Sequence, residues 1–417
     1  MKIEQTTDSQ LGQSCCPQQD DVRMNIPQAA RTPIAMLCFL LVSGFIYYSI
    51  RLNHWISWIP LNHGDYDRLG FVANLETTHN SVFEKKTDLP NISLLPCVGG
   101  ETQRRMQEIF PKFLTGPRVP IFLDRTFLRN KDMRRLQPPF GFSGQELIIN
   151  KVLSKTKNYE LPTRIQSLKC KRCVIVGNGG ILRNKSLGVK IDQYDIIVRL
   201  NSAPVLGYEH DVGTNTTLRI TYPEGAMRDP RKYERDSLFV FTGFKRNDYM
   251  WLYNIVVQRK VVGRSSEEKD KFWCAIEKLM ENAKDEEVVV NPTKGFWKPV
   301  ATRIPRRPQD IRILNPIFIN EAAFALIGLP SNNFVMGRGN IPTLGATAIT
   351  MALHLCDQVA VAGFGYDLLD DDAYLHYYES TRMSAIKESW THNIEKEKEF
   401  LRKLVDARII LDLTGRI

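Results

Sequence analysis

Two histidines near the C-terminal end of the chain have side chains suited to proton transfer. His376 stands in HYYE and His392 stands in HNIEKE, and the sequence contains 7 histidines in 417 residues. Imidazole titrates near neutral pH, so one ring can accept a proton from a hydroxyl group. A protonated ring can donate a hydrogen bond to an oxyanion as charge develops there. A structural role for both rings is the alternative.

A glycine-containing turn and two asparagines form a second candidate site. VIVGNGG ends a predicted strand in glycines, but a dinucleotide fingerprint requires glycine at Gly177, Gly179 and the position of Leu182. Asn178 in this turn and Asn201 at the end of the next predicted strand are better candidates, because ligands of open parallel sheets bind beyond the carboxyl ends of strands. Asparagine offers a donor and an acceptor to a cytosine or ribose edge. A tight turn without a ligand is the alternative.

The start of a predicted helix over residues 345–356 has groups that can bind an anion. Thr343 and Gly345 offer a hydroxyl and backbone N–H groups, which suit a phosphate or a carboxylate. A threonine cap and a packing glycine are the alternative. Gly365 in GFGYD closes another predicted strand and indicates close backbone approach. His354, inside the helix, is interpreted as a core histidine with a satisfied hydrogen bond.

Patterns for metal binding and for hydrolysis are weak. Asp370, Asp371 and Asp372 have the D-x-D spacing of many metal-dependent glycosyltransferases, but they precede His376 in a polar loop and are interpreted as solvated. CKRC, which ends at Cys173, would need a second pair of Cys or His at ligand spacing to bind zinc, so structural disulfides are favoured. The sequence also lacks the G-x-S-x-G and papain-like cysteine patterns.

Seven apolar runs are predicted to be strands, and most are separated by enough chain for a helix. They are residues 173–177, 195–201, 217–221, 238–244, 311–315, 359–365 and 407–413. Helices are predicted over residues 345–356 and over residues 395–405, where apolar side chains form one stripe. Strands that alternate with helices predict an α/β fold with a mostly parallel sheet covered on both faces.

The compact domain is predicted over residues 138–417, from PPFGF to the C-terminus, with a stem and peripheral segment over residues 51–137. Residues 264–293 are charge-rich and are interpreted as a surface excursion that includes Cys274. A hydrophobic content of 43% is ample for a core. The net charge of +10 is dispersed, and no nucleic-acid-binding signature accompanies it, so nucleic acid is not an expected partner. Attraction of an anionic small molecule or simple solvation explains the charge.

Residues 33–50 contain no charge and lie between Arg31 and Arg51, which is about the minimum for a membrane-spanning helix. Tyr47, Tyr48, Trp55 and Trp58 lie where interfacial aromatic residues are found. The polar leader over residues 1–32 is long for a cleaved signal, so a signal-anchor is predicted, with a signal peptide or a buried helix as alternatives. The basic residues weakly favour a cytosolic tail over residues 1–32.

The region after this span has features of a lumenal protein. Three glycosylation sequons begin at Asn91, Asn184 and Asn215. Five cysteines follow the span, an odd number that leaves one unpaired in an oxidising compartment: Cys97, Cys170, Cys173, Cys274 and Cys356.

Four segments in order resemble the large, small, third and very small sialylmotifs of animal sialyltransferases. They are VIVGNGGILRNKSLGVKIDQYDIIVRLNSAP, PTLGATAITMALHLCDQVAVAGFGYD, HYYE and HNIEKE. The resemblance covers residues 138–417. LNSAPVLGYEHDVG, TYPEGAM, GFWKPVATRIP and GRGNIPTLG are most similar to the members that sialylate the galactose of N-acetyllactosamine.

The resemblance implies a Rossmann-like fold, the sialyltransferase variant of the glycosyltransferase A fold, behind the membrane anchor and stem. It implies a type II Golgi membrane enzyme that transfers N-acetylneuraminic acid from CMP-sialic acid to the 3-hydroxyl of a terminal β-galactose, with inversion. The partners would be CMP-sialic acid and galactose-terminated glycans of glycoproteins or glycolipids, and no metal or other cofactor is expected. Lactosylceramide or Gal-GalNAc as acceptor is the first alternative. A non-catalytic sialoglycan-binding protein is the second, which the intact histidine pair disfavours.

The resemblance also implies roles for individual residues. His392 would be the general base and His376 the partner of the leaving phosphate, while Glu397 would either orient His392 or be structural. Apart from the resemblance, Phe296 and Trp297 can form part of an acceptor wall, because aromatic faces pack on the apolar side of galactose, with core packing as the alternative. The implied disulfides join Cys173 to Cys356 and Cys97 to Cys170. The residues implied at the donor are Asn178, Asn201, Thr343, Gly345, Gly365 and Tyr374.

Overall fold

The computed structural model describes residues 96–114, 119–257, 295–337, 339–365, 370, 372–384 and 391–417. All of them belong to one compact unit, Pro90–Ile417. The predicted cytosolic tail, the span over residues 33–50, Asn91 and the segment over residues 264–293 with Cys274 lie outside the described residues. Within the described ranges, no helix has the length and apolar character needed to cross a bilayer.

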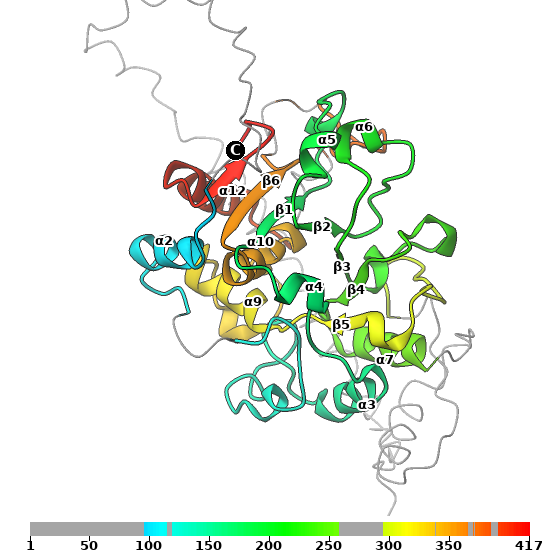
Figure 1. Cartoon of the computed structure of the whole chain (residues 1–417). Coiled ribbons are helices and arrows are strands. Elements are labelled where there is room, and N and C mark those ends of the chain that lie inside the picture. Colours follow the sequence, from blue (N-terminus) through cyan, green and yellow to red (C-terminus); the bar gives the residue numbers. More distant parts are fainter. Residues whose placement is uncertain are drawn as a thin grey trace, which may run out of the picture. The chain divides into compact units, whose positions relative to one another are not determined.

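A seven-stranded sheet forms the centre of the molecule, in the order β5-β4-β3-β2-β1-β6-β7 (Figure 1). Every pairing in this sheet is parallel. Each strand overlaps one of the seven predicted runs, so the predicted α/β fold with a parallel sheet is confirmed. The strands are β1 (Arg172–Val176), β2 (Ile196–Leu200), β3 (Leu218–Thr221), β4 (Leu238–Phe241), β5 (Ile311–Ile313), β6 (Gln358–Ala362) and β7 (Ile410–Asp412).

Apolar side chains project from both faces of the sheet, and its strands are therefore continuous apolar runs in the sequence. All five residues of β2 are buried. Ile196 and Val198 join a core shared with the helices of one face, and Ile197 joins a separate cluster on the other. The first face is covered by α2 (Glu101–Ile109), α9 (Ile317–Asn320), α10 (Leu344–Leu355) and α12 (Ile394–Asp406). The other face carries α3 (Glu146–Thr156), α5 (Gly188–Ile191), α6 (Glu209–Val212) and α7 (Arg246–Val256).

The strand order reverses beside β1, and this point positions the site. β1 pairs with β2 on one side and with β6 on the other. Loops leave the carboxyl ends of these strands at one edge of the sheet, so Asn178, Asn201 and Gly363 lie along the same edge. In open α/β sheets, such a switch point is where ligands bind.

Both disulfides implied by the resemblance are present. Cys173 in β1 is bonded to Cys356, which follows α10, and Cys97 is bonded to Cys170. The first bond joins two elements that carry parts of the sheet edge. CKRC is therefore neither a redox pair nor half of a zinc site, because its two cysteines have different partners.

Residues before Pro138, the predicted start of the compact domain, also pack into its core. Met106, Phe110 and Phe122 are buried in the core of the first face. Gln103 Nε2 donates hydrogen bonds to the carbonyl oxygens at the end of α10, at 2.8 Å for Leu353. Apolar residues in this stretch are irregularly spaced, so periodicity did not reveal their burial.

Candidate active site

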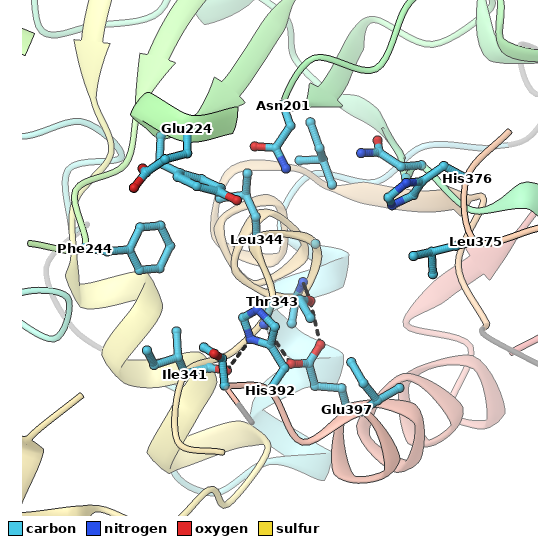
Figure 2. A pocket seen from close by; sticks show the side chains of 18 of the residues that line it. Asn201, Glu224, Phe244, Ile341, Thr343, Leu344, Leu375, His376, His392 and Glu397 are labelled. Atoms are coloured by element: carbon cyan, nitrogen blue, oxygen red, sulfur yellow. Dashed lines mark hydrogen bonds between the residues drawn. The ribbon is translucent and has the colours of Figure 1, made fainter. Parts of the chain in front are cut away.

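A cavity of about 730 Å³ lies at the carboxyl edge of the sheet (Figure 2). Every residue predicted to contact a substrate lines this cavity except Tyr374, and these residues come from segments far apart in the sequence. They are Asn178, Asn201, Phe296, Trp297, Thr343, Gly345, Gly365, His376, His392 and Glu397. A volume of this size suits a small-molecule substrate.

The turn after β1 is packed tightly against the turn after β6. A Cβ atom at Gly177 or Gly179 would lie 2.6 Å from the carbonyl oxygen of Gly363. These glycines therefore allow two backbone segments to pack closely, which is the role that the tight-turn alternative gives them. Asn178, between them, has a buried side-chain oxygen with no hydrogen-bond partner within the described part of the chain. That oxygen is an acceptor available to a ligand's amino or hydroxyl group.

Asn201 is held in a left-handed conformation, with φ of 53°. Arg219 Nη1 donates to its carbonyl oxygen at 2.7 Å, and the Thr221 hydroxyl donates to its side-chain oxygen at 3.4 Å. A Cβ at Gly225 would lie 2.2 Å from that side-chain oxygen. The glycine of TYPEGAM therefore makes room for the Asn201 amide in the cavity wall.

The start of α10 already holds a carboxylate of the protein. Thr343 caps the helix, since its Oγ1 accepts from the Ala346 N–H at 3.2 Å. The Thr343 N–H and hydroxyl donate to the two oxygens of Glu397, at 2.7 Å and 2.6 Å. Glu397 thus occupies the anion position that we predicted for a substrate group. Burial raises the pKa of Glu397 to about 7, although its bonds from Thr343 act in the opposite direction.

The two other predicted glycines are sites of close approach. A Cβ at Gly345 would lie 2.7 Å from Phe364 Cε1, which agrees with the packing alternative. Gly365 has φ of 86°, and a Cβ there would lie 2.4 Å from the carbonyl oxygen of Arg416. Both line the cavity, so their small size shapes its wall.

His392 is oriented by a backbone carbonyl from the segment before α10. Its Nδ1 donates to the carbonyl oxygen of Ile341 at 2.8 Å, which leaves the lone pair on Nε2. Burial lowers the pKa of His392, and the bond to Ile341 opposes this only in part. The ring is therefore neutral at neutral pH, as a proton acceptor must be. Asn393 then caps α12, with its side chain accepting from the Lys396 N–H.

His376 lies in a segment that docks on the turn after β1. The Gly180 N–H donates to the Leu375 carbonyl oxygen at 3.1 Å, and the Tyr377 N–H donates to the Asn178 carbonyl oxygen at 3.0 Å. His376 Nδ1 is hydrogen-bonded to the Glu379 carboxylate. These contacts bring two of the sequence motifs together at one side of the cavity.

Arg183 fixes the His376 segment, and sequence reasoning missed it. Its Nε donates to the Tyr377 carbonyl oxygen at 2.9 Å and its Nη2 to the Glu379 carbonyl oxygen at 2.6 Å. Its guanidinium also lies 3.6 Å from the centre of the Tyr374 ring. Tyr374 lines a neighbouring cavity of about 350 Å³, so its predicted place near the donor stays a prediction. No sequence pattern marks a single arginine in a loop as a clamp.

Phe296 and Trp297 differ in exposure although both line the cavity. Phe296 is 9% exposed and belongs to a core cluster, whereas Trp297 is 70% exposed. Phe296 therefore packs in the core and also lines the cavity. The same side of the cavity contains Glu224 and Lys245, which sequence reasoning also missed. Charged residues in predicted loops ordinarily indicate solvated positions.

The described residues contain no group of three or more His, Cys, Asp or Glu side chains placed to hold a metal ion. Asp370 Oδ1 accepts from the Asp372 N–H at 3.1 Å and the Ala373 N–H at 3.0 Å, and both aspartates are exposed. This local turn agrees with the interpretation of a solvated loop, and Asp371 lies outside the described residues.

His354 has the hydrogen-bond partner that we expected of a core histidine. Its Nε2 lies 2.6 Å from Glu321 Oε2, and its ring stacks on Phe113. Asn184 and Asn215, at the two sequons within the described ranges, are exposed.

Comparisons with known proteins identify the family of this chain. The model of glycosyltransferase family 29 (sialyltransferase) matches residues 122–294 and 276–409. The human CMP-N-acetylneuraminate-beta-1,4-galactoside alpha-2,3-sialyltransferase is 51% identical over 401 residues, which are 93% of this chain and 98% of the relative. The rat lactosylceramide alpha-2,3-sialyltransferase is 34% identical over 388 residues, 91% of this chain and 89% of the relative.

A solved structure has the same fold. The crystal structure of a mammalian sialyltransferase in complex with Gal-beta-1-3GalNAc-ortho-nitrophenol superposes with a TM-score of 0.52 at 20% identity, and the match covers 77% of this chain and all of that one. The family model and the relatives together show that this chain belongs to glycosyltransferase family 29, the sialyltransferases.

Proposed function

We propose that the protein transfers N-acetylneuraminic acid from CMP-sialic acid to the 3-hydroxyl of a terminal β-galactose on N-acetyllactosamine-type glycans. The observation that carries this proposal is the 51% identity, along nearly the whole chain, to a relative named for α-2,3 transfer to a β-1,4-galactoside. The lactosylceramide relative is less similar, at 34%. The difference supports N-acetyllactosamine rather than lactosylceramide as the acceptor.

The two histidines supply the proton chemistry of this transfer. The acceptor hydroxyl must lose a proton as it attacks, and neutral His392, with its lone pair on Nε2, is suited to accept it. The leaving phosphate must be stabilised, and His376 lies beside the turn that carries Asn178. Because Glu397 already accepts from Thr343, His376 is the stronger candidate for the phosphate contact. Attack from the face opposite the phosphate inverts the anomeric centre.

The remaining features concern the donor and the compartment. The unpaired side-chain oxygen of Asn178 is placed to accept a hydrogen bond from the cytidine monophosphate part of the donor. Two disulfides and the exposed sequons at Asn184 and Asn215 support a lumenal domain. The proposed location is therefore the Golgi membrane, with residues 33–50 as a type II anchor.

Transfer from labelled CMP-sialic acid by the full-length protein in detergent tests the acceptor. We expect kcat/KM to be highest for Galβ1-3GlcNAc and Galβ1-4GlcNAc, compared with Galβ1-3GalNAc and lactosylceramide. Contacts to the second sugar are a few hydrogen bonds of about 0.5–1.5 kcal/mol each, so preferences of roughly tenfold are expected. A higher value for either of the last two would contradict the acceptor, and absence of any transfer would contradict the function.

Activity should persist in excess EDTA. The departing group carries one phosphate, so a hydrogen bond from His376 can offset its developing charge without a divalent cation. The measurement is the transfer rate before and after chelation. Loss of activity that manganese restores would contradict the proposal and indicate Asp370 and Asp372 as ligands.

A further inference from the structure

Glu224 is a buried carboxylate in the cavity wall that the proposed chemistry does not use. It lies in η4 (Pro223–Gly225), just after β3, and is 2% exposed. Its Oε1 accepts a hydrogen bond from Lys245 Nζ at 2.8 Å. Its Oε2 is buried and has no hydrogen-bond partner among the residues that the structure describes. An unpaired buried oxygen costs free energy, so a donor from a ligand or water is expected to reach it.

Asp248 places a second negative charge beside the same lysine. Lys245 Nζ lies 2.6 Å from Asp248 Oδ1, while Asp248 Oδ2 accepts from the N–H groups of Phe244 and Lys245. Burial raises the pKa of Asp248 to about 6, so its carboxyl is mostly ionised at neutral pH. The Lys245 ammonium group therefore contacts two carboxylates, and the Lys298 ammonium group also interacts electrostatically with Glu224.

The two substrates differ in how they meet these carboxylates. The donor carries a phosphate and a carboxylate, and both are anions that Glu224 and Asp248 repel. The acceptor is a neutral sugar whose hydroxyl groups donate the hydrogen bonds that a carboxylate accepts. Figure 2 shows Glu224 and His376 to either side of Asn201. In this view the Glu224 carboxylate lies away from His376, the candidate phosphate partner.

Aromatic rings line the same cavity as this carboxylate. Tyr222 and Phe244 make an edge contact with ring centres 5.4 Å apart, and the Phe296 ring lies 4.9 Å from Lys245 Nζ. All three rings line the cavity. A sugar ring can pack its C–H groups on such faces while one of its hydroxyl groups bonds the Glu224 carboxylate. Apolar walls with few, well-placed polar groups are typical of small-molecule sites.

We propose that Glu224 accepts a hydrogen bond from a non-reacting hydroxyl group of the acceptor galactose, with Lys245 holding the carboxylate in place. This inference rests on the proposed transfer to galactose. The two oxygens of a carboxylate accept hydrogen bonds independently, so Oε1 can stay on Lys245 while Oε2 accepts from the sugar. A site built to bond a hydroxyl group rejects the sugar that lacks it, because the buried acceptor is then left unpaired.

The test compares the full-length protein with its Glu224→Gln variant, which keeps the size of the side chain and removes its charge. The acceptors are N-acetyllactosamine and its 2-deoxy, 4-deoxy and 6-deoxy galactose analogues. In the unchanged protein, one analogue should lose about 10- to 100-fold in kcat/KM. In Glu224→Gln, that penalty should fall to within about 3-fold, because a neutral amide makes a weaker bond. The KM for CMP-sialic acid and the hydrolysis of donor without acceptor should not change.

Glu321→Gln is the matched control, because Glu321 is also 2% exposed and bonds His354 away from the cavity. It should keep the deoxy pattern of the unchanged protein. Equal deoxy penalties in Glu224→Gln and the unchanged protein overturn the inference, as does a loss confined to the donor KM. If Glu224→Gln does not fold, the unchanged protein decides: a penalty at one hydroxyl supports the inference, and three analogues within about 2-fold of the parent overturn it. Absence of transfer to every galactoside would instead overturn the proposed function.

Discussion

The two histidines of the cavity are held in unlike ways. His392 lies between two helix starts, half-buried, with Nδ1 bonded to a neutral backbone carbonyl of Ile341. His376 lies in an irregular segment that rests on the turn after β1, with Nδ1 bonded to the Glu379 carboxylate and its ring stacked on Tyr378. The hydrogen-bond partner of Nδ1 is therefore a neutral carbonyl for His392 and a carboxylate for His376.

The proposed roles of proton acceptor and phosphate contact therefore follow from the hydrogen-bond partner and the burial of each ring, since the residue type is the same. An imidazole with Nδ1 bonded to a carbonyl is suited to take a proton at Nε2, and a ring held by a carboxylate at Nδ1 can donate a hydrogen bond to a phosphate from its other nitrogen. Different environments around two similar groups distinguish acid from base in many active sites. The predictions below test each half of this contrast.

Replacement of His392 should have the largest effect. His392→Ala removes the proton acceptor, so kcat should fall by about 100- to 10,000-fold, as loss of a general base does. Donor binding should remain, because the donor contacts proposed here lie at the turn after β1. Single-turnover transfer and equilibrium binding of CMP measure the two quantities separately.

His354→Ala is the control for this prediction, since His354 is a half-buried histidine bonded to Glu321 outside the cavity. It should reduce stability while kcat of the folded protein changes little. Near-normal turnover of a folded His392→Ala protein would remove the base from His392 and erase the contrast between the two rings.

Glu397 offers a test of how the His392 side is held. Its carboxyl has a pKa of about 7 in the folded chain, against 4.5 for the free side chain. Between these values the unfolded chain has lost a proton that the folded chain keeps, so the free energy of unfolding should fall as pH rises from about 4.5 to 7. The expected fall is on the order of 1–3 kcal/mol.

Glu397→Gln has no proton to lose, so its urea-unfolding free energy should vary less over the same pH range. Subtraction of the two curves removes the contribution of Asp248, whose pKa is also raised by burial. Glu395→Gln, at an exposed glutamate in the same helical turn, should follow the unchanged protein. Parallel curves for Glu397→Gln and the unchanged protein would show that Glu397 is ionised throughout and that its burial costs little.

Most of the sheet could be predicted from the sequence, because strands buried on both faces are continuous apolar runs. α10 and α12 were also predicted within a residue or two. α7 was not, since nearly every side chain in it is buried and no amphipathic stripe marks it. The burial of Met106, Phe110 and Phe122 was missed for a related reason, because irregularly spaced apolar residues have no period to detect.

The candidate site could be predicted as a set of residues but not as a set of contacts. His376, His392 and Asn178 stand in recognisable motifs, and the fold brings them to one cavity. Spacing along the chain does not reveal that Glu397 bonds Thr343, because the two are 54 residues apart. Glu224 was missed because a buried, ion-paired carboxylate and a solvated one look the same in a sequence.

Arg183 gives the smallest effect and tests the His376 side. Its guanidinium holds the segment by two carbonyl oxygens and by the face of Tyr374. Arg183→Ala should lower kcat by about 10-fold, because a loosened His376 samples its productive position less often. Arg183→Lys should recover only part of this loss, because an ammonium group cannot reproduce the fork that bonds two carbonyls and stacks on a ring.

A positioning role makes Arg183 depend on His376, and that dependence separates it from a general loss of packing. In a His376→Ala background, Arg183→Ala should change kcat by less than about 2-fold, since nothing remains to be positioned. Arg382→Ala is the matched control. The Arg382 guanidinium also stacks on the Tyr374 ring, but it donates to the Asp372 carbonyl oxygen and not to the segment that carries His376. It should lower kcat by less than about 2-fold, as a change outside the clamp does. A full 10-fold loss in the His376→Ala background would mean that Arg183 acts on stability alone, and the two histidines would then differ in their partners but not in how firmly the chain holds them.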